Sequence, residues 1–184
     1  MTPEYYLAHI DLKAMAKPDF STMFIDPEVF KNLALDLSRP FLKDEIDKVA
    51  CPESMGFIFG AAVARRLNKG LVPIRKAGKL PTIKSRVTRQ SFLDYTKERN
   101  SFEMNKSLIQ PGDRVLLVDD WAETGGQLKG LIKLIEKRGG VIAGISLLGF
   151  NRVKKTRALA DNYKLRAIIE HTLEGERDLT KPLA

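Results

Sequence analysis

The residues around position 120 constrain the fold of this chain more than any other segment. Val115–Val118 is an uninterrupted apolar run, which is typical of a strand buried on both faces. Asp119 and Asp120 follow at once, a Thr124–Gly126 turn comes next, and an apolar helical pattern begins at Leu128. This order predicts a buried strand, a loop and a helix N-terminus in immediate succession, as in a parallel α/β sheet.

The rest of the chain continues this alternation of strands and helices. Asp26 and Pro27 are typical of the start of a helix, and Pro40 marks its end or a kink. Further helices are predicted at residues 56–67, 127–138 and 152–159, further strands at 47–51, 71–74, 82–87, 101–104, 141–148 and 165–169, and a mobile loop at 91–100. Residues 1–184 are therefore expected to form a single α/β domain with a parallel sheet and helices on both faces.

Composition narrows the class of protein. The 184 residues include one cysteine, Cys51, so an intramolecular disulfide is impossible. The N-terminal residues do not resemble a secretory signal, and no apolar run has the length of a membrane span, so we expect a cytoplasmic protein without membrane contact. The net charge of +8 indicates an anionic partner. A small phosphorylated ligand is favoured over nucleic acid, because no recognisable nucleic-acid module is present.

Two adjacent carboxylates at the end of a buried strand point to a ligand. Neighbouring carboxylates repel each other, so hydroxyl groups, a cation or backbone donors have to compensate. Asp119 and Asp120 suit the vicinal hydroxyls of a sugar, although one of them could simply cap the following helix. The backbone N–H groups of residues 123–127 are expected at a helix N-terminus, where phosphate binds well. The segment therefore predicts a sugar-phosphate site.

A second candidate site lies where a predicted strand ends in Arg75 and Lys76. Lys79 follows after Gly78, so three cations gather around a glycine. Such a cluster suits a diphosphate. The alternative is a solvated basic turn, and the acid pair elsewhere in the chain favours the diphosphate.

Several of these segments resemble one enzyme family. Residues Val115–Gln127 resemble the phosphoribosylpyrophosphate (PRPP) signature of the type I phosphoribosyltransferases. Residues 26–30, 56–62 and 72–81 resemble the adenine phosphoribosyltransferases of that family, and the likeness extends over about residues 18–148. It implies the type I fold with a small N-terminal hood at about residues 1–25. It also implies transfer of ribose 5-phosphate from PRPP to a purine base with release of pyrophosphate, a role for Mg²⁺, and a homodimer.

The resemblance assigns roles to individual residues. Those that would bind the ribose 5-phosphate part of PRPP are Asp119, Asp120, Ala122, Glu123, Thr124, Gly125, Gly126 and Gln127. Those that would bind pyrophosphate are Ser54, Met55, Gly56, Arg75, Lys76 and Lys79. Phe20 and Phe150 would line the base pocket, although Phe150 could equally be a core residue. No side chain is expected to bind Mg²⁺ directly, because PRPP would hold the ion, with Asp119 and Asp120 nearby.

Several positions depart from the adenine pattern, and one of them lies in the hood, where Pro18 and Asp19 stand in place of the family's Arg-Asp. Met55 stands where the family has an arginine, and Trp121 replaces an aliphatic residue, either as a wall of the site or as packing. Asp94 replaces a glutamate of the family's mobile catalytic loop. Glu123 stands where adenine enzymes have alanine, and where hypoxanthine–guanine and xanthine enzymes have an aspartate that serves in proton transfer.

Asp94 and Glu123 are therefore the candidate catalytic residues, because acid–base work needs a titratable group within hydrogen-bond reach. Glu123 could instead point to solvent or pair with a cation. Three functions stay open. The first is an adenine enzyme; the second is a 6-oxopurine (hypoxanthine, guanine or xanthine) enzyme, which Glu123 favours. The third is a PRPP-binding regulator without transferase activity, which Met55, Asp94 and the high pI favour. Cys51 is predicted to be a packing residue, and His171 a surface or tail residue.

Overall fold

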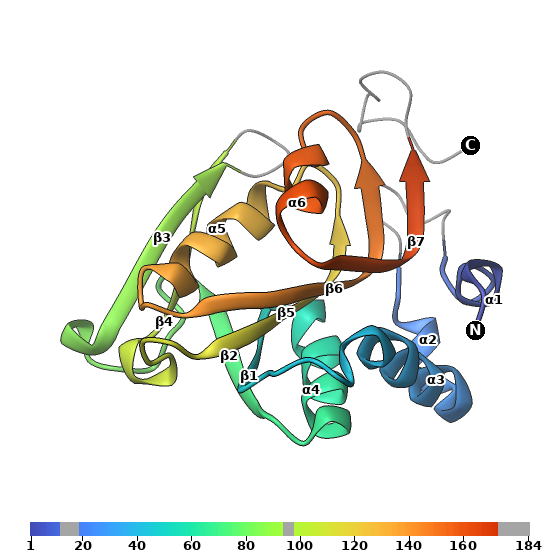
Figure 1. Ribbon diagram of the computed structural model, residues 1–184, viewed down its shortest axis with the longest axis horizontal. Helices are drawn as coiled ribbons and strands as arrows, with labels where there is room; N and C mark the ends of the chain where they lie inside the picture. The colour runs from blue at the N-terminus through green and yellow to red at the C-terminus, as the bar shows by residue number, and fades with distance from the viewer. Residues whose placement is uncertain (12–18, 94–97, 173–184) are drawn as a thin grey trace.

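A seven-stranded mixed sheet forms the centre of the computed structural model, which describes residues 1–11, 19–93 and 98–172 (Figure 1). The strand order is β3-β4-β2-β1-β5-β6-β7. β1, β2, β5, β6 and β7 run parallel, whereas β3 and β4 form an antiparallel hairpin at the edge beside β2. The strands are β1 (Lys48–Pro52), β2 (Gly70–Lys76), β3 (Val87–Leu93), β4 (Arg99–Asn105), β5 (Arg114–Ala122), β6 (Val141–Arg152) and β7 (Leu165–Thr172).

Helices cover both faces of the sheet, as the alternating pattern predicts. α5 and α6 lie on one face, and α3 and α4 lie on the other, with α1 and α2 beside α3 (Figure 1). In the described part of the chain no helix is long and apolar enough to span a membrane. The helices are α1 (Pro3–Leu7), α2 (Thr22–Ile25), α3 (Pro27–Ser38), α4 (Met55–Leu67), α5 (Gly126–Glu136) and α6 (Arg157–Asn162), with 3-10 turns η1 (Arg39–Phe41), η2 (Lys84–Arg86) and η3 (Lys106–Leu108).

The apolar run of β5 is explained by a core on each side of it. Val115 and Leu117 pack into the cluster under α5, which includes Leu131. Leu116 and Val118 alternate with them and pack into the cluster under α3 and α4. Because successive strand residues point to opposite faces, a strand with two buried faces has to be apolar throughout.

The start of α3 follows the sequence signal. The Asp26 side chain accepts hydrogen bonds from the N–H groups of Glu28 and Val29 at 2.9 and 3.2 Å, and Pro27 is the first helical residue. Such a cap is worth about 1 kcal/mol. The N-terminal segment packs beside this helix through fully buried Tyr6, whose hydroxyl donates to Asp36 Oδ2 at 2.7 Å.

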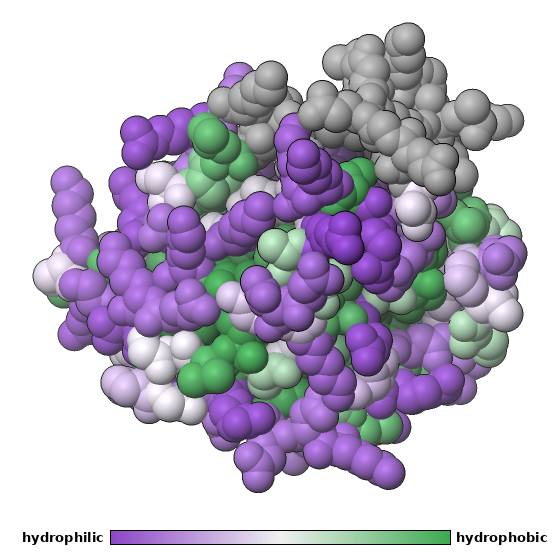
Figure 2. Space-filling model, turned by 45° about the horizontal axis from the view of Figure 1, so that its top comes forward, coloured by the Kyte–Doolittle hydropathy of each residue, from purple (hydrophilic) through white to green (hydrophobic). Residues whose placement is uncertain are grey.

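The strand order positions a ligand site between β1 and β5. β1 and β5 are neighbours in the sheet. The connection from β1 leads through α4 to β2 on one side, whereas the connection from β5 leads through α5 to β6 on the other side. In open α/β sheets, ligands bind outside the carboxyl ends of the strands at such a switch point. Figure 2 tilts this end of the molecule toward the viewer, and the coloured surface in that view is mostly hydrophilic, with a few hydrophobic patches between.

Several predicted boundaries differ from the structure. The strand expected at 82–87 is wrong: this segment holds η2, β3 begins only at Val87, and Ile83 is exposed, so the alternation has no core to face. Of the mobile loop expected at 91–100, residues 91–93 belong to β3 and residues 99–100 to β4, and residues 94–97 lie outside the described part of the chain. The helix expected at 152–159 begins only at Arg157, since β6 continues to Arg152. The edge hairpin makes the sheet mixed rather than wholly parallel.

Candidate active site

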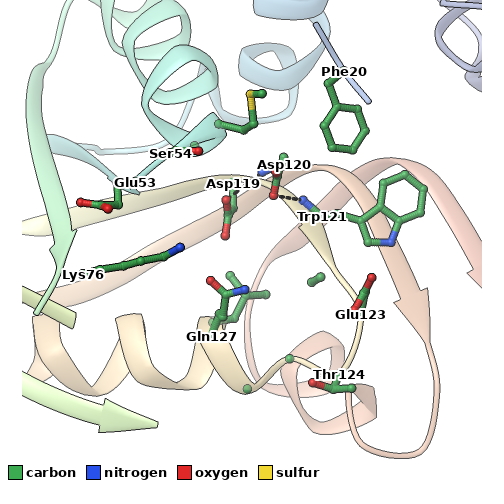
Figure 3. A pocket seen from close by; sticks show the side chains of 16 residues that line it. Phe20, Glu53, Ser54, Lys76, Asp119, Asp120, Trp121, Glu123, Thr124 and Gln127 are labelled. Carbon is green, nitrogen blue, oxygen red and sulfur yellow. Dashed lines mark hydrogen bonds between the residues drawn. The ribbon is translucent and has the colours of Figure 1, made fainter. Parts of the chain in front are cut away.

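A cavity of about 310 Å³ opens at the carboxyl ends of β1 and β5 (Figure 3). Its walls come from the segment that joins β1 to α4, the end of β5, and the loop that leads into α5. Phe20 of the N-terminal segment and Lys76 at the end of β2 complete it. The described lining residues are Phe20, Glu53, Ser54, Met55, Gly56, Lys76, Asp119, Asp120, Trp121, Ala122, Glu123, Thr124, Gly125, Gly126, Gln127 and Leu128.

The acid pair lies at the centre of the cavity wall and inside β5, which continues to Ala122, rather than after it. Asp119 is only 6% exposed, and its Oδ1 accepts the Asp120 backbone N–H at 2.9 Å. Burial and the charge of Asp120 raise the pKa of the Asp119 carboxyl well above its usual range. Gly56 makes this arrangement possible, because a Cβ there would lie 3.0 Å from Asp119 Oδ1. A buried carboxylate of this kind needs hydroxyl or cationic partners when it ionises.

Two helices begin at this cavity. α4 starts at Met55 and α5 at Gly126, and both starts belong to its lining. Gly125 precedes α5 with a φ of 73°, which favours glycine. Helix N-termini carry partial positive charge and unsatisfied N–H donors, so each end suits an anion. The cavity thus offers two anion sites with the acid pair beside them.

The three predicted pyrophosphate cations do not share one environment. Among the described lining residues, Lys76 is the only cation. Arg75 and Lys79 are not in the lining: Arg75 Nε donates to Glu53 Oε2 at 2.6 Å, and Lys79 Nζ to Glu53 Oε1 at 2.8 Å. Within one chain, therefore, only Lys76 of the three lines the cavity, and Glu53 binds the other two. The resemblance implies that part of this set reaches across a dimer interface, so the role predicted for Arg75 and Lys79 stays a prediction. Ser54, Met55 and Gly56 line the cavity as expected.

An aromatic wall forms the other end of the cavity. The rings of Phe20 and Trp121 are stacked, with centroids 6.3 Å apart and planes at 18°. His171 stacks on Trp121, with centroids 5.7 Å apart, and Trp121 Nε1 donates to Asn151 Oδ1 at 3.2 Å. Trp121 therefore both lines the site and packs, so the two roles weighed for it coexist. Such a wall suits a flat heterocycle.

The remaining candidate residues are Phe150, Asp94 and Glu123. Phe150 is fully buried in the core under α5, lies within β6 rather than beyond its end, and does not line the cavity, so the structure does not place it in a base pocket. Asp94 lies outside the described residues. Glu123, the other catalytic candidate, is partly buried and lines the cavity.

Sequence reasoning did not predict three of the interactions at this site. The first is made by Glu53, although a carboxylate near three cations is the natural partner to look for. Asn151 and His171 support Trp121 from β6 and β7. No local motif marks them, because only the pairing of β6 with β7 brings them to this wall.

Comparison with known proteins agrees with this geometry. Residues 28–177 match the family model of the phosphoribosyl transferase domain. The chain belongs to the phosphoribosyltransferase family. The enzyme class and the type I fold expected from the sequence are thereby confirmed.

Individual relatives cover most of this phosphoribosyltransferase. The adenine phosphoribosyltransferase of Dinoroseobacter shibae is 44% identical over 130 residues, which are 71% of this chain and 70% of that protein. The one of Rhodopseudomonas palustris is 37% identical over 186 aligned positions, with coverage of 92% and 98%. The solved structure of the adenine enzyme of Giardia lamblia with 9-deazaadenine has a TM-score of 0.82 at 29% identity and covers 94% of this chain and 99% of its own.

Proposed function

We propose that this phosphoribosyltransferase transfers the phosphoribosyl group of PRPP to adenine, forming AMP and releasing pyrophosphate. A nitrogen of the base attacks the anomeric carbon, the bond from that carbon to the diphosphate oxygen breaks, and the diphosphate leaves with the electron pair. The observation that carries the proposal is one cavity with two helix N-termini, a carboxylate pair and an aromatic wall. PRPP is anionic at both ends and carries two hydroxyls between them, which fits this order.

Each part of PRPP has a matching part of the cavity. The 5-phosphate would bind the start of α5 at residues 124–127, where backbone N–H groups gather at a helix N-terminus. The ribose hydroxyls would bind Asp119 and Asp120. The diphosphate would bind the start of α4 and the ammonium group of Lys76. In this arrangement the protein contributes positioning and electrostatics rather than covalent chemistry.

The donor set fits a Mg²⁺ ion that the substrate mostly holds. The described residues contain no cluster of three or more histidine, cysteine or carboxylate side chains, and the cavity offers Asp119 and Asp120 as an acidic pair. Mg²⁺ keeps several waters and is usually bound through one or two carboxylates together with substrate phosphates. When bound, it would neutralise the charge that develops on the leaving diphosphate.

The aromatic end would hold the base. Phe20 and Trp121 offer flat apolar surfaces, and Glu123 lies in the same lining. Glu123 would exchange a proton with a ring nitrogen of the purine as the new bond forms. The family resemblance suggests a catalytic role for Asp94 as well, a residue that lies outside the described part of the chain.

Two observations bear on which base is used. The relatives that cover most of this chain carry the name adenine phosphoribosyltransferase, which favours adenine. Glu123 favours a 6-oxopurine as the second candidate, because a carboxylate there can serve the imidazole nitrogen of hypoxanthine, guanine or xanthine. A regulator without transferase activity has no such support from the relatives.

A panel of bases tests the proposal directly. Pyrophosphate release would be measured with PRPP, Mg²⁺ and adenine, hypoxanthine, guanine or xanthine in turn, with a reaction lacking base as the control. We expect adenine to give the highest kcat/KM. Turnover of only a 6-oxopurine would overturn the choice of base, and release with none of the four would overturn the transferase proposal itself.

A homodimer and a cytoplasmic location belong to the same proposal. The homodimer is implied by the family resemblance, in which part of the cationic set reaches across a dimer interface, and the cytoplasmic location is the expectation drawn from the sequence. Sedimentation of the purified chain at micromolar concentration is expected to give twice the mass of one chain, and the mass of a single chain would rule the dimer out.

A further inference from the structure

Two nearly buried carboxylates hold the segment that follows β2. Glu53 accepts hydrogen bonds from Arg75 and Lys79, on the side that faces the cavity. Glu103 of β4 lies in the neighbouring strand and is not part of the cavity lining. Its Oε1 accepts the backbone N–H groups of Gly78 and Leu80 at 2.9 and 3.0 Å.

Glu103 is held more completely than a surface carboxylate. It is 2% exposed, and Arg89 Nη2 donates to its Oε2 at 2.8 Å. Burial alone would raise its pKa, but Arg89 and the two backbone donors outweigh it, so the pKa of Glu103 lies below its usual range. Burying a charge is costly unless it is paired and hydrogen-bonded, so the turn and Arg89 together make this charged group tolerable in the core.

The turn that Glu103 holds is joined directly to the cation of the cavity. Lys76 is the last residue of β2 and pairs with Phe102, the neighbour of Glu103. Ala77 N–H then donates to Ser101 O at 2.9 Å, and Gly78 turns the chain with a φ of 85°. Three backbone N–H groups after Lys76 therefore donate hydrogen bonds to β4: that of Ala77 to Ser101 O, and those of Gly78 and Leu80 to Glu103.

We propose that Glu103 is a positioning residue for the diphosphate end of the active site. It fixes the turn at residues 77–80, so that Lys76 points into the cavity and Lys79 stays on Glu53. This inference rests on the proposed function, because it assumes that Lys76 binds the diphosphate of PRPP. The competing explanation is that Glu103 only stabilises the fold.

The experiment is a double-mutant cycle between Glu103 and Lys76. Glu103→Ala removes the acceptor of both turn N–H groups, Glu103→Gln restores an oxygen that can accept them, and Lys76→Met removes the ammonium group. For each variant we would measure KM for PRPP, KM for adenine, and the dissociation constant of pyrophosphate by calorimetry. Asp113→Asn is the matched control. Like Glu103, Asp113 accepts hydrogen bonds from a backbone N–H group, that of Gln110 at 2.6 Å, and from a cationic side chain, Lys48, but it does not line the cavity.

A positioning role predicts a selective effect. Glu103→Ala should raise KM for PRPP and the dissociation constant of pyrophosphate about tenfold, the usual scale for one charge-assisted contact, and leave KM for adenine within about twofold. Glu103→Gln should recover most of the loss. In the Lys76→Met background, Glu103→Ala should add less than about twofold, because residues that act as a unit are not additive.

The outcomes separate the inference from the proposed function. Equal losses for PRPP and adenine, full additivity with Lys76→Met, or the same losses in Asp113→Asn would overturn the positioning role. If Glu103→Ala does not fold, Glu103→Met takes its place, because it fills the same space without an oxygen acceptor, and unchanged pyrophosphate binding in that variant overturns the positioning role as well. An unsubstituted protein that binds pyrophosphate but consumes no purine would contradict the proposed function and leave the pyrophosphate arm of the cycle valid.

Discussion

The indole of Trp121 lies directly against Gly149, its partner across β5 and β6. A Cβ built on Gly149 would lie 2.1 Å from Trp121 Cε3, a distance that real Cβ atoms essentially never show. Phe20 and His171 stack on the same indole, and Asn151 accepts its N–H. Trp121 is thus contacted on several sides, so its position in the aromatic wall is fixed by packing against residues from distant segments of the chain.

Gly149→Ala should displace this wall. The added methyl group overpacks the site at a cost of about 1–3 kcal/mol in unfolding free energy. Because Trp121 would have to move, KM for the base should rise at least about tenfold, while KM for PRPP changes little. Steady-state kinetics and urea unfolding check both parts. Gly70→Ala is the control, since a Cβ there meets nothing within 4 Å, and an unchanged KM for the base in Gly149→Ala would contradict the role of the wall.

Part of this site could be read from the sequence because it is local. The apolar run, the acid pair and the Thr-Gly-Gly turn lie within thirteen consecutive residues. A buried strand that is followed directly by the start of a helix is compatible with few fold classes besides the α/β class. The helix cap at Asp26 was equally predictable, because its hydrogen bonds go to the next turn. Signals of this kind depend on neighbours in the chain.

The errors arose where distant segments meet. β5 and β6 are longer than predicted because Trp121 pairs with Gly149 and Ala122 with Phe150. No local sequence pattern predicts this pairing. The same pairing places Phe150 on the core face, and a strand buried on both faces gives no periodicity to reveal which residues face a ligand. Arg75 and Lys79 bind Glu53, more than twenty residues away, so their charge alone did not indicate their position.

Gly126→Ala should weaken PRPP binding. A Cβ at Gly126 would lie 2.1 Å from the carbonyl oxygen of Leu93, so either the end of β3 or the start of α5 has to shift. Both flank the proposed 5-phosphate site, and we expect KM for PRPP to rise at least about tenfold, as misplaced contacts do. The affinity for ribose 5-phosphate, measured by calorimetry, should fall in parallel. Full retention of both would show that this close contact has no part in binding.

Asp119→Asn combined with Asp120→Asn should weaken PRPP binding while the fold persists. The amide oxygen introduced at position 119 can still accept the backbone N–H of residue 120, a hydrogen bond that Asp119 now accepts at 2.9 Å, so the local geometry has little reason to change. Loss of two charge-assisted contacts to hydroxyls predicts about a hundredfold weaker binding. Calorimetry with PRPP and Mg²⁺ measures it, with circular dichroism as the control for folding. Unchanged affinity would remove the acid pair from the PRPP site.

Cys51 should resist thiol reagents in the folded protein. Its side chain has no exposed surface, and a Cβ on Gly60 would lie 2.5 Å from Cys51 Sγ, so α4 packs tightly over it. Burial, with a smaller effect of Asp119, raises the pKa of the thiol to about 12. At pH 8 only about one thiol in ten thousand would then be ionised. Reaction with an aromatic disulfide reagent should therefore need denaturant, and rapid labelling of the native protein would contradict the packing.

The raised pKa of Asp119 predicts a pH dependence of stability with an unusual sign. Burial, together with the charge of Asp120, makes the folded state hold the Asp119 proton more tightly than the unfolded chain, where the pKa is about 3.9. Between these two pKa values the folded state binds more protons, so this group makes the free energy of unfolding fall as pH rises above about 4.

Urea unfolding of the unliganded protein from pH 4 to pH 8, with a chelator present, measures this fall. Asp119→Asn cannot ionise at this position, so its stability relative to the unsubstituted protein should increase as the pH rises from 4 toward the raised pKa of Asp119. Asp120→Asn removes the neighbouring charge and should give a smaller change in the same direction, because burial of Asp119 remains. Parallel stability curves for the unsubstituted protein and Asp119→Asn would mean that the carboxyl ionises in the folded protein as easily as in the unfolded chain.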